Sequence, residues 1–204
     1  MKTLEGCTFC EVAPGAKSGI YERTIIETPN FRVFPTMGQI AEGYVLIVPK
    51  EHHACIGAMP EPVIDEFIEL KDRVDKLVTE AYQKPIYFEH GVIGQTVLHA
   101  HMHVIPFNDD FREDFIERRF KSQFDYREPI QSIKDLKDIW KNFGVYLFYE
   151  SHDKQEAYVT DIVPMYARIV VADALEVPER ANWKTMDRTL DEKLIESTLK
   201  KLRK

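Results

Sequence analysis

Residues 97–106 read Val97-Leu98-His99-Ala100-His101-Met102-His103-Val104-Ile105-Pro106, with histidines at alternate positions. Successive side chains of an extended strand point to opposite faces of the sheet. We therefore predict a strand with three imidazoles on one face, while Leu98, Ala100, Met102 and Val104 face the core. A lone histidine on a strand is usually a partly exposed, hydrogen-bonded residue, and three in register are harder to explain in that way. The histidine face is the candidate for chemistry.

A single metal ion cannot bind all three histidines of a straight strand. At a rise of about 3.3 Å per residue, the outer two stand about 13 Å apart, whereas a zinc–nitrogen bond is about 2 Å long. At most two adjacent histidines can share one ion. At least one imidazole is therefore available for another role.

The composition is that of an ordinary globular protein. The chain has 204 residues, 44% hydrophobic and 30% charged, which is enough for one domain or for one domain with a large appendage. Because no apolar run approaches the ~20 residues needed to cross a bilayer, we expect no membrane span. The first six residues contain no apolar stretch typical of a secretory signal, so we expect a cytoplasmic protein.

Charge and cysteine content narrow the class of partner. A net charge of −7 argues against broad nucleic-acid binding, since phosphate backbones favour dense lysine and arginine. Small anionic ligands remain allowed, because local amides and imidazoles can outweigh a distant negative field. The three cysteines, Cys7, Cys10 and Cys55, favour reduced thiols over disulfides in a cytosolic chain.

The hydrophobic pattern predicts a sheet with helices, followed by a segment of different character. Strands are predicted at 21–27, 31–34, 44–48, 86–89 and 97–106, the first three as an antiparallel meander, with a helix at 62–83. The strongly charged stretch after Pro106 marks the predicted boundary, which divides the chain into domains 1–107 and 108–204. The second part is predicted to contain a helix at 133–143, a hairpin of 145–149 with 157–162, helices at 164–175 and 190–202, and an extended stretch at 178–184.

Two motifs in order resemble the histidine-triad family. Gly94-Gln95-Thr96-Val97 leads into the alternating histidines, and Gly43-Tyr44-Val45-Leu46-Ile47-Val48-Pro49-Lys50-Glu51-His52 is similar to the family's central strand and Pro-x-x-His corner. The resemblance covers roughly residues 5–107. It implies an α+β fold, an antiparallel sheet with flanking helices. Residues 108–204 are predicted to add a C-terminal α/β extension that packs on the core or on a dimer partner. The resemblance also implies a homodimer.

The resemblance implies a nucleotidyl hydrolase or transferase that attacks a nucleotide α-phosphate. The middle histidine, His101, would be the nucleophile and form a covalent intermediate. His103 and Gln95 would donate hydrogen bonds to phosphate oxygens. Gly94 and Thr96 would line the anion site, although Gly94 is equally a turn residue, and Thr36 would occupy the ribose position with a hydroxyl alone. The substrate would be a dinucleoside polyphosphate, a phosphoramidate or another adenylated compound, with no organic cofactor.

The same resemblance implies a structural zinc site. Its ligands would be Cys7, Cys10, His52 and His99, since two cysteines and two histidines satisfy tetrahedral zinc. His53 is an alternative to His52 as the third ligand. The alternative to a zinc site is a pair of reduced thiols at Cys7 and Cys10. Cys55 is predicted to be a buried small residue.

Two features depart from the shorter members of the family. The turn Phe88-Glu89-His90-Gly91 is unusual. His90 either reaches the pocket or is a capping or surface histidine. The extension carries polar and aromatic residues that could close over a neighbouring active site: Tyr166, Arg168, Arg180, Asn182, Trp183 and Lys184. Alternatively, Trp183 only anchors the extension to the core. Two other functions stay open, a zinc-dependent hydrolase with strand histidines as ligands and a nucleotide-binding scaffold without turnover.

Overall fold

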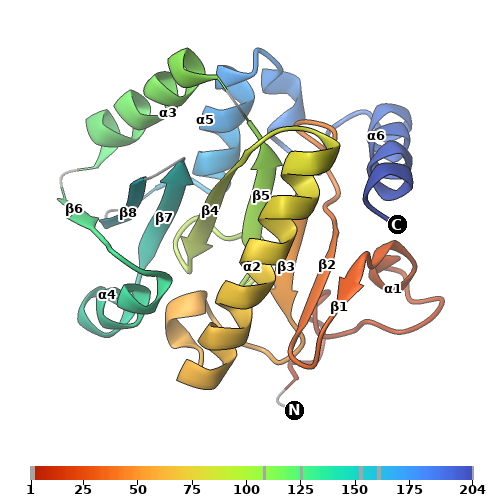
Figure 1. Ribbon diagram of the computed structural model, residues 1–204, viewed down its shortest axis with the longest axis horizontal. Helices are drawn as coiled ribbons and strands as arrows, with labels where there is room; N and C mark the ends of the chain where they lie inside the picture. Colours follow the sequence, from red (N-terminus) through yellow and green to blue (C-terminus); the bar gives the residue numbers. More distant parts are fainter. Residues whose placement is uncertain (1–2, 108, 125, 152–153, 160–161, 204) are drawn as a thin grey trace.

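The computed structural model describes residues 3–107, 109–124, 126–151, 154–159 and 162–203. Within this part of the chain, one antiparallel sheet has the strand order β1-β2-β3-β5-β4-β7-β8-β6 (Figure 1). The strands are β1 (Ile26–Glu27), β2 (Phe31–Pro35), β3 (Val45–Pro49), β4 (Pro85–Gly91), β5 (Met102–Pro106), β6 (Tyr126–Pro129), β7 (Tyr146–Ser151) and β8 (Lys154–Val159). The predicted α+β class with an antiparallel sheet and flanking helices is confirmed.

Helices cover both faces of this sheet. The α-helices are α1 (Ile20–Arg23), α2 (Glu61–Ala81), α3 (Asp110–Gln123), α4 (Leu136–Phe143), α5 (Tyr166–Ala174) and α6 (Arg188–Leu202), and the 3-10 helices are η1 (Ile56–Ala58), η2 (Ile133–Asp135) and η3 (Pro178–Arg180). The long helix α2 crosses in front of the sheet, and α5 lies behind it (Figure 1). In the described residues, no helix is both long enough and apolar enough to cross a membrane.

Alternating side chains divide the core into two layers. On β3, Val45 and Ile47 pack into the layer that contains α2, whereas Leu46 packs into the layer that contains α5. On β5, Met102 and Val104 face α2, so the intervening residue His103 faces the α5 side. This period of two places the chemical face of the sheet beneath α5.

The residues after 107 add to the same sheet. β7 pairs antiparallel with β4 from Tyr146 to Glu150, with Phe88 opposite Tyr149, and β8 and β6 follow outward. The predicted hairpin is present as β7 and β8, with Ser151 opposite Lys154. His152 and Asp153, which fall in its predicted turn, lie outside the described residues. The division of the chain into domains 1–107 and 108–204 stays a prediction.

The histidine run differs from the predicted strand at its start. The regular strand begins at Met102 rather than at Val97. Before it, the amide of His99 donates to the carbonyl of Val97 at 2.8 Å, which bends the chain and leaves Leu98 67% exposed rather than in the core. The three imidazoles nevertheless lie on one side, since Phe9 contacts the rings of His99 and His101, and His101 contacts His103.

Two other local predictions are corrected, and two elements have no counterpart in the sequence prediction. Residues predicted as the strand 21–27 form α1 and the short β1, because the Arg23 side chain binds the carbonyls of Gly19, Ser18 and Pro35 and so stabilises a helical turn. The stretch 178–184, predicted as extended, begins with the 3-10 helix η3. The sequence pattern does not predict α3 and β6: in α3 the buried Ile116 and Phe120 stand among charged residues that mask the periodicity.

Candidate active site and metal cluster

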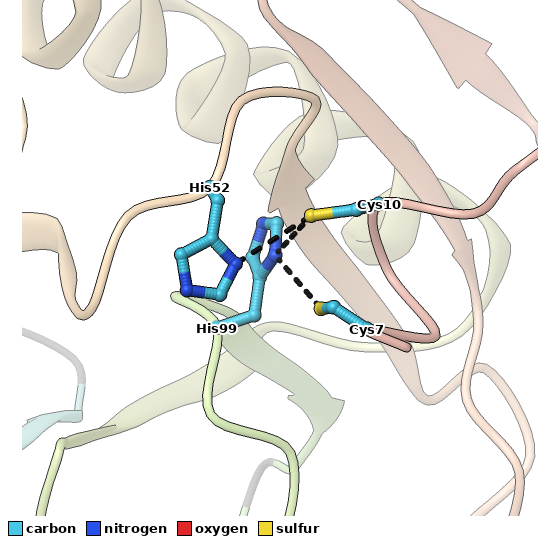
Figure 2. A group of neighbouring side chains, drawn as sticks. All are labelled: Cys7, Cys10, His52 and His99. Atoms are coloured by element: carbon cyan, nitrogen blue, oxygen red, sulfur yellow. Dashed lines mark hydrogen bonds between the residues drawn. The ribbon is translucent and has the colours of Figure 1, made fainter. Parts of the chain in front are cut away.

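Four side chains with metal-binding atoms come together at the start of the histidine run. The ligand atoms of Cys7, Cys10, His52 and His99 all lie within 4.8 Å of one another (Figure 2). Nδ1 of His99 is 3.4 Å from the sulfur of Cys7 and 3.5 Å from that of Cys10, and Nδ1 of His52 is 3.5 Å from the sulfur of Cys10. Two thiols and two imidazoles at this separation fit the donor set of a tetrahedral zinc ion.

Each ligand of this cluster is delivered by local backbone structure. The amides of Cys10 and Glu11 both donate to the carbonyl of Cys7, and this turn aims the two sulfurs in one direction. His52 lies in the loop after β3, which ends at Pro49. His53 is not part of the group, and its backbone carbonyl instead accepts from the amide of Ala100 at 2.7 Å. The structure therefore brings together the ligand set that contains His52.

A hydrogen bond behind the ring orients His99. Its Nε2 lies 2.9 Å from the carbonyl of Pro49, which can only accept, so Nε2 carries the proton and Nδ1 presents its lone pair to the sulfurs. Burial lowers the pKa of His99 to about 4, which keeps the ring neutral. A neutral imidazole held by a carbonyl on its far nitrogen is the usual form of a histidine metal ligand.

A pocket opens beside this cluster on the α5 side of the sheet. Predicted residues that line it are Thr36, Gly94, Thr96, His101 and His103. His90, for which the sequence allowed either the pocket or the surface, also lines it. Gln95 does not, because its side-chain amide turns away and donates to the carbonyl of Ala54 at 2.9 Å. Apolar side chains complete the wall, among them Phe9, Ile20, Phe34, Leu46 and Val97.

His101 is held in a single tautomer. Its Nδ1 lies 2.6 Å from the carbonyl of His99, so Nδ1 carries the proton and Nε2 is the unprotonated nitrogen. Burial lowers the pKa of His101 to about 4, although the same hydrogen bond favours the charged form. The ring is therefore neutral at pH 7, with a lone pair available for attack on an electrophile.

His103 is held by two side chains, those of Phe88 and Tyr44. Its ring stacks on Phe88 with centroids 4.2 Å apart, and its Nδ1 is hydrogen-bonded to the hydroxyl of Tyr44. Its Nε2 is buried and has no hydrogen-bond partner among the described residues. A polar atom in that state, on a ring that lines a pocket, is suited to bind a ligand.

The glycine and threonine positions of the pocket have defined contacts. Gly94 has φ +75°, and a Cβ there would lie 2.9 Å from His90, so the position favours glycine both for its turn and for close approach. The hydroxyl of Thr36 donates to the carbonyl of Met37 at 3.0 Å. The hydroxyl of Thr96 accepts from the indole of Trp183 at 3.2 Å.

The extension supplies part of this same pocket. Met165, Arg168 and Trp183 line it, and the amide of Met165 donates to the carbonyl of Gly94 at 2.9 Å. Trp183 both anchors the extension and borders the pocket. In the sequence, Arg168 and Trp183 are two of several candidates in the extension, and no signal separates them from Tyr166 or Lys184. These candidates were expected at a neighbouring active site and not at the chain's own pocket.

Comparison with known proteins gives a consistent match to one family. A sequence profile of the HIT domain matches residues 17–110. The chain is 31% identical over 105 residues to the uncharacterized HIT-like protein MJ0866 of Methanocaldococcus jannaschii, an alignment that covers 49% of this chain and 78% of that protein. It is 29% identical over 104 residues to adenosine 5′-monophosphoramidase HNT1 of Saccharomyces cerevisiae, covering 51% of this chain. This alignment spans 64% of the yeast protein, less than two thirds of its length.

The crystal structure of a zinc-bound histidine triad family protein from Mycobacterium smegmatis aligns with a TM-score of 0.44 and 22% identity, covering 51% of this chain and 76% of the other. The profile match ends at residue 110, so α5 and α6 lie beyond it.

Proposed function

Because the chain belongs to the histidine-triad (HIT) family, we propose that it cleaves nucleotides at the α-phosphate with His101 as the nucleophile. The observation that carries this proposal is the hydrogen bond from Nδ1 of His101 to the His99 carbonyl, which leaves Nε2 unprotonated on a ring that lines the pocket. A nitrogen with a free lone pair can attack phosphorus, whereas a protonated one cannot.

The reaction would proceed in two displacements. Nε2 of His101 forms a bond to the α-phosphorus while the bond from phosphorus to the leaving group breaks, and the leaving group takes up a proton. Water then attacks the phosphorus of the nucleotidyl-histidine, releases the nucleoside monophosphate and restores His101. An acceptor other than water would make the second step a transfer. His103 would donate to a non-bridging oxygen, where charge grows during both displacements.

The substrate is proposed from the named activity of relatives. Two of the similar fungal proteins, from Saccharomyces cerevisiae and Candida albicans, are called adenosine 5′-monophosphoramidases, at 29% and 28% identity. We propose a nucleoside phosphoramidate, with dinucleoside polyphosphates and other adenylated compounds as the alternatives. Gln95 points toward Ala54 and takes no part in phosphate binding in this proposal.

The four-residue cluster would hold a structural zinc ion. Four protein ligands, Cys7, Cys10, His52 and His99, fill a tetrahedral shell and leave no position for an activated water. The ion would cross-link the amino-terminal segment to the loop after β3 and to the start of the histidine run. In this proposal its contribution is to the free energy of unfolding and to the position of His99. The homodimer and the cytoplasmic location stay predictions.

The decisive test replaces the nucleophile and restores it from solution. His101→Gly should lower turnover of adenosine 5′-monophosphoramidate by more than about a thousandfold, as removal of a covalent nucleophile does elsewhere. Added imidazole should partly restore it, because the vacated site admits the free base. Wild type incubated with an α-³²P-labelled nucleotide should yield an acid-labile protein adduct that the variant lacks.

Two results would contradict the proposal. One is unchanged turnover in a folded His101→Gly variant. The other is nucleotide binding without product in the wild type at long incubation, which would support the scaffold hypothesis instead. Circular dichroism spectra of both proteins provide the control for folding.

A further inference from the structure

Arg168 connects the extension to the centre of the pocket. It lies on α5, beyond the part of the chain that the HIT profile matches, and is 3% exposed. Its Nε donates to the carbonyl of Ala181 at 2.9 Å, and its Nη2 donates to the carbonyl of Gly38 at 2.7 Å. These bonds fix the guanidinium plane from both sides. The remaining donor, Nη1, reaches the hydroxyl of Tyr44 at 3.0 Å.

The chemistry of these groups determines the direction of the hydrogen bonds. A guanidinium has donors and no acceptor, so the Tyr44 oxygen must accept from Arg168. Its own proton is then free to be donated, and the hydroxyl is hydrogen-bonded to Nδ1 of His103. Burial raises the pKa of Tyr44 to about 12, which keeps that proton on the hydroxyl at neutral pH.

The hydrogen bond from Tyr44 also determines the protonation of the other ring nitrogen of His103. When Nδ1 accepts a hydrogen bond in a neutral imidazole, Nε2 carries the proton. That Nε2 is the buried atom with no partner among the described residues, on a ring that lines the pocket. This Nε2–H group can therefore donate to a ligand bound in the pocket.

We infer that Arg168 is a positioning residue, which acts through the Tyr44 hydroxyl to hold His103 in the tautomer whose Nε2–H binds a phosphate oxygen of the substrate. The inference rests on the proposed function for the identity of the acceptor. The tautomer itself depends only on Arg168, Tyr44 and His103.

Charge supports the same assignment. In the described part of the chain, the hydrogen bonds of Arg168 go to neutral oxygens, the carbonyls of Gly38, Arg180 and Ala181 and the Tyr44 hydroxyl. Its positive charge therefore favours an anion in the adjoining pocket and disfavours a second cation. Burial, with smaller contributions from His101, His90 and Arg168, holds the pKa of His103 well below its ordinary value, so its ring donates as a neutral group.

Tyr44→Phe is the cleanest variant, because it removes the connecting hydroxyl and leaves the carbonyl contacts of Arg168 in place. In the free wild-type protein, ¹⁵N NMR of the imidazoles should show His103 protonated on Nε2. In Tyr44→Phe the same ring should become a mixture of the two neutral tautomers. With adenosine 5′-monophosphoramidate, kcat should fall by about tenfold or more while KM changes less than about threefold, the pattern for an interaction made in the transition state.

Arg168 itself is tested by a pair of variants. Arg168→Met should show the same tautomer mixture and a similar loss in kcat, and Arg168→Lys, which retains a donor and the charge, should fall between Met and wild type. Tyr82→Phe is the matched control, since its hydroxyl binds Glu42 and not the pocket, and its kcat should stay within about twofold of wild type.

The outcomes separate this inference from the proposed function. If Tyr44→Phe keeps the Nε2–H tautomer and the wild-type kcat, the inference is overturned even when His101→Gly is inactive. A tautomer change in Tyr44→Phe, in a protein that turns over no nucleotide, would support the relay and reject the proposed function. If Tyr44→Phe does not fold, Arg168→Lys and Arg168→Met give the same two readouts.

Discussion

His99 and His103 lie four positions apart in one run, both buried, yet they present opposite ring nitrogens. His99 is held through Nε2 by the Pro49 carbonyl and turns Nδ1 to the cysteines. His103 is held through Nδ1 by the Tyr44 hydroxyl and leaves Nε2 toward the pocket. The group behind the ring therefore determines which nitrogen faces forward, so that His99 joins the four-residue cluster at one end of the run and His103 lines the pocket at the other.

The two ends also differ in which parts of the chain they need. The metal cluster is assembled from the amino-terminal turn, the loop after β3 and the start of the histidine run. The pocket end depends in addition on α5 and on Trp183, which belong to the extension. Variants that disturb one end and spare the other test whether the two ends are independent.

The largest effect is expected from removal of the metal. Cys7→Ser, or chelation of the wild type, should abolish bound zinc and lower the free energy of unfolding by about 4 kcal/mol at a thousandfold excess of free zinc over its dissociation constant. Metal content by elemental analysis and thermal unfolding with and without zinc measure this. Cys55→Ala is the control, because Cys55 is buried away from the group, and its metal content should equal that of wild type.

The same experiment tests the catalytic-metal hypothesis. Turnover that survives chelation in a protein that stays folded would reject the zinc-dependent hydrolase. If wild-type protein supplied with zinc binds none, the four-residue cluster is not a zinc site.

A smaller effect is expected where the extension meets the pocket. Gly38 has φ +76°, and a Cβ there would lie 2.3 Å from Cβ of Trp183 and 2.9 Å from Nη2 of Arg168. Gly38→Ala should therefore displace the extension and cost about 2 kcal/mol of stability, a typical cost of overpacking. Denaturant unfolding and tryptophan fluorescence measure it, and bound zinc should be unchanged.

Gly15→Ala is the matched control for this variant. Gly15 has φ +73°, and a Cβ there would meet no atom within 4 Å, so the substitution shares the backbone cost without the clash. Equal losses in the two variants would show that close approach to Trp183 contributes nothing.

The last effect is confined to acidic pH and concerns another buried imidazole, that of His90. His90 accepts from the amide of Ala167 at 3.3 Å, and burial lowers its pKa to about 3 from an ordinary value of 6.5. The unfolded chain therefore binds a proton below about pH 6.5 that the folded chain excludes. The contribution of His90 is fully present above this pH and is lost as the pH falls toward 3, by up to about 1.4 kcal/mol per pH unit.

His90→Gln keeps an acceptor for Ala167 and removes the titration. Its unfolding free energy should fall less steeply than that of wild type between about pH 6 and pH 4, as measured by urea unfolding at a series of pH values. Parallel curves for the two proteins would show that His90 is not held neutral by the fold.

Local patterns in the sequence were sufficient for the elements with strong periodicity. Helix α2 was expected at 62–83 and spans Glu61–Ala81, because its apolar positions recur on one face and Pro62 suits a first turn. The β1–β2–β3 meander and the β7–β8 hairpin follow from alternating strands and short connections. The strand proposed over 21–27 failed because the carbonyl contacts of Arg23, including one to Pro35, stabilise a helical turn that no local pattern shows.

The sequence identified the alternating histidines and the two spaced cysteines as candidates for chemistry, because both patterns are local properties of a chain. For His99 and His103, the nitrogen that each ring presents depends on tertiary structure, because their partners, Pro49 and Tyr44, lie 50 and 59 positions away. Tyr44 and Arg168 are 124 positions apart, and they meet because Tyr44, which directly precedes β3, lies in the core layer that α5 forms on one face of the sheet. A hydrogen bond between such distant groups leaves no trace in sequence spacing, since the folded core, and not the local chain, brings its two partners together.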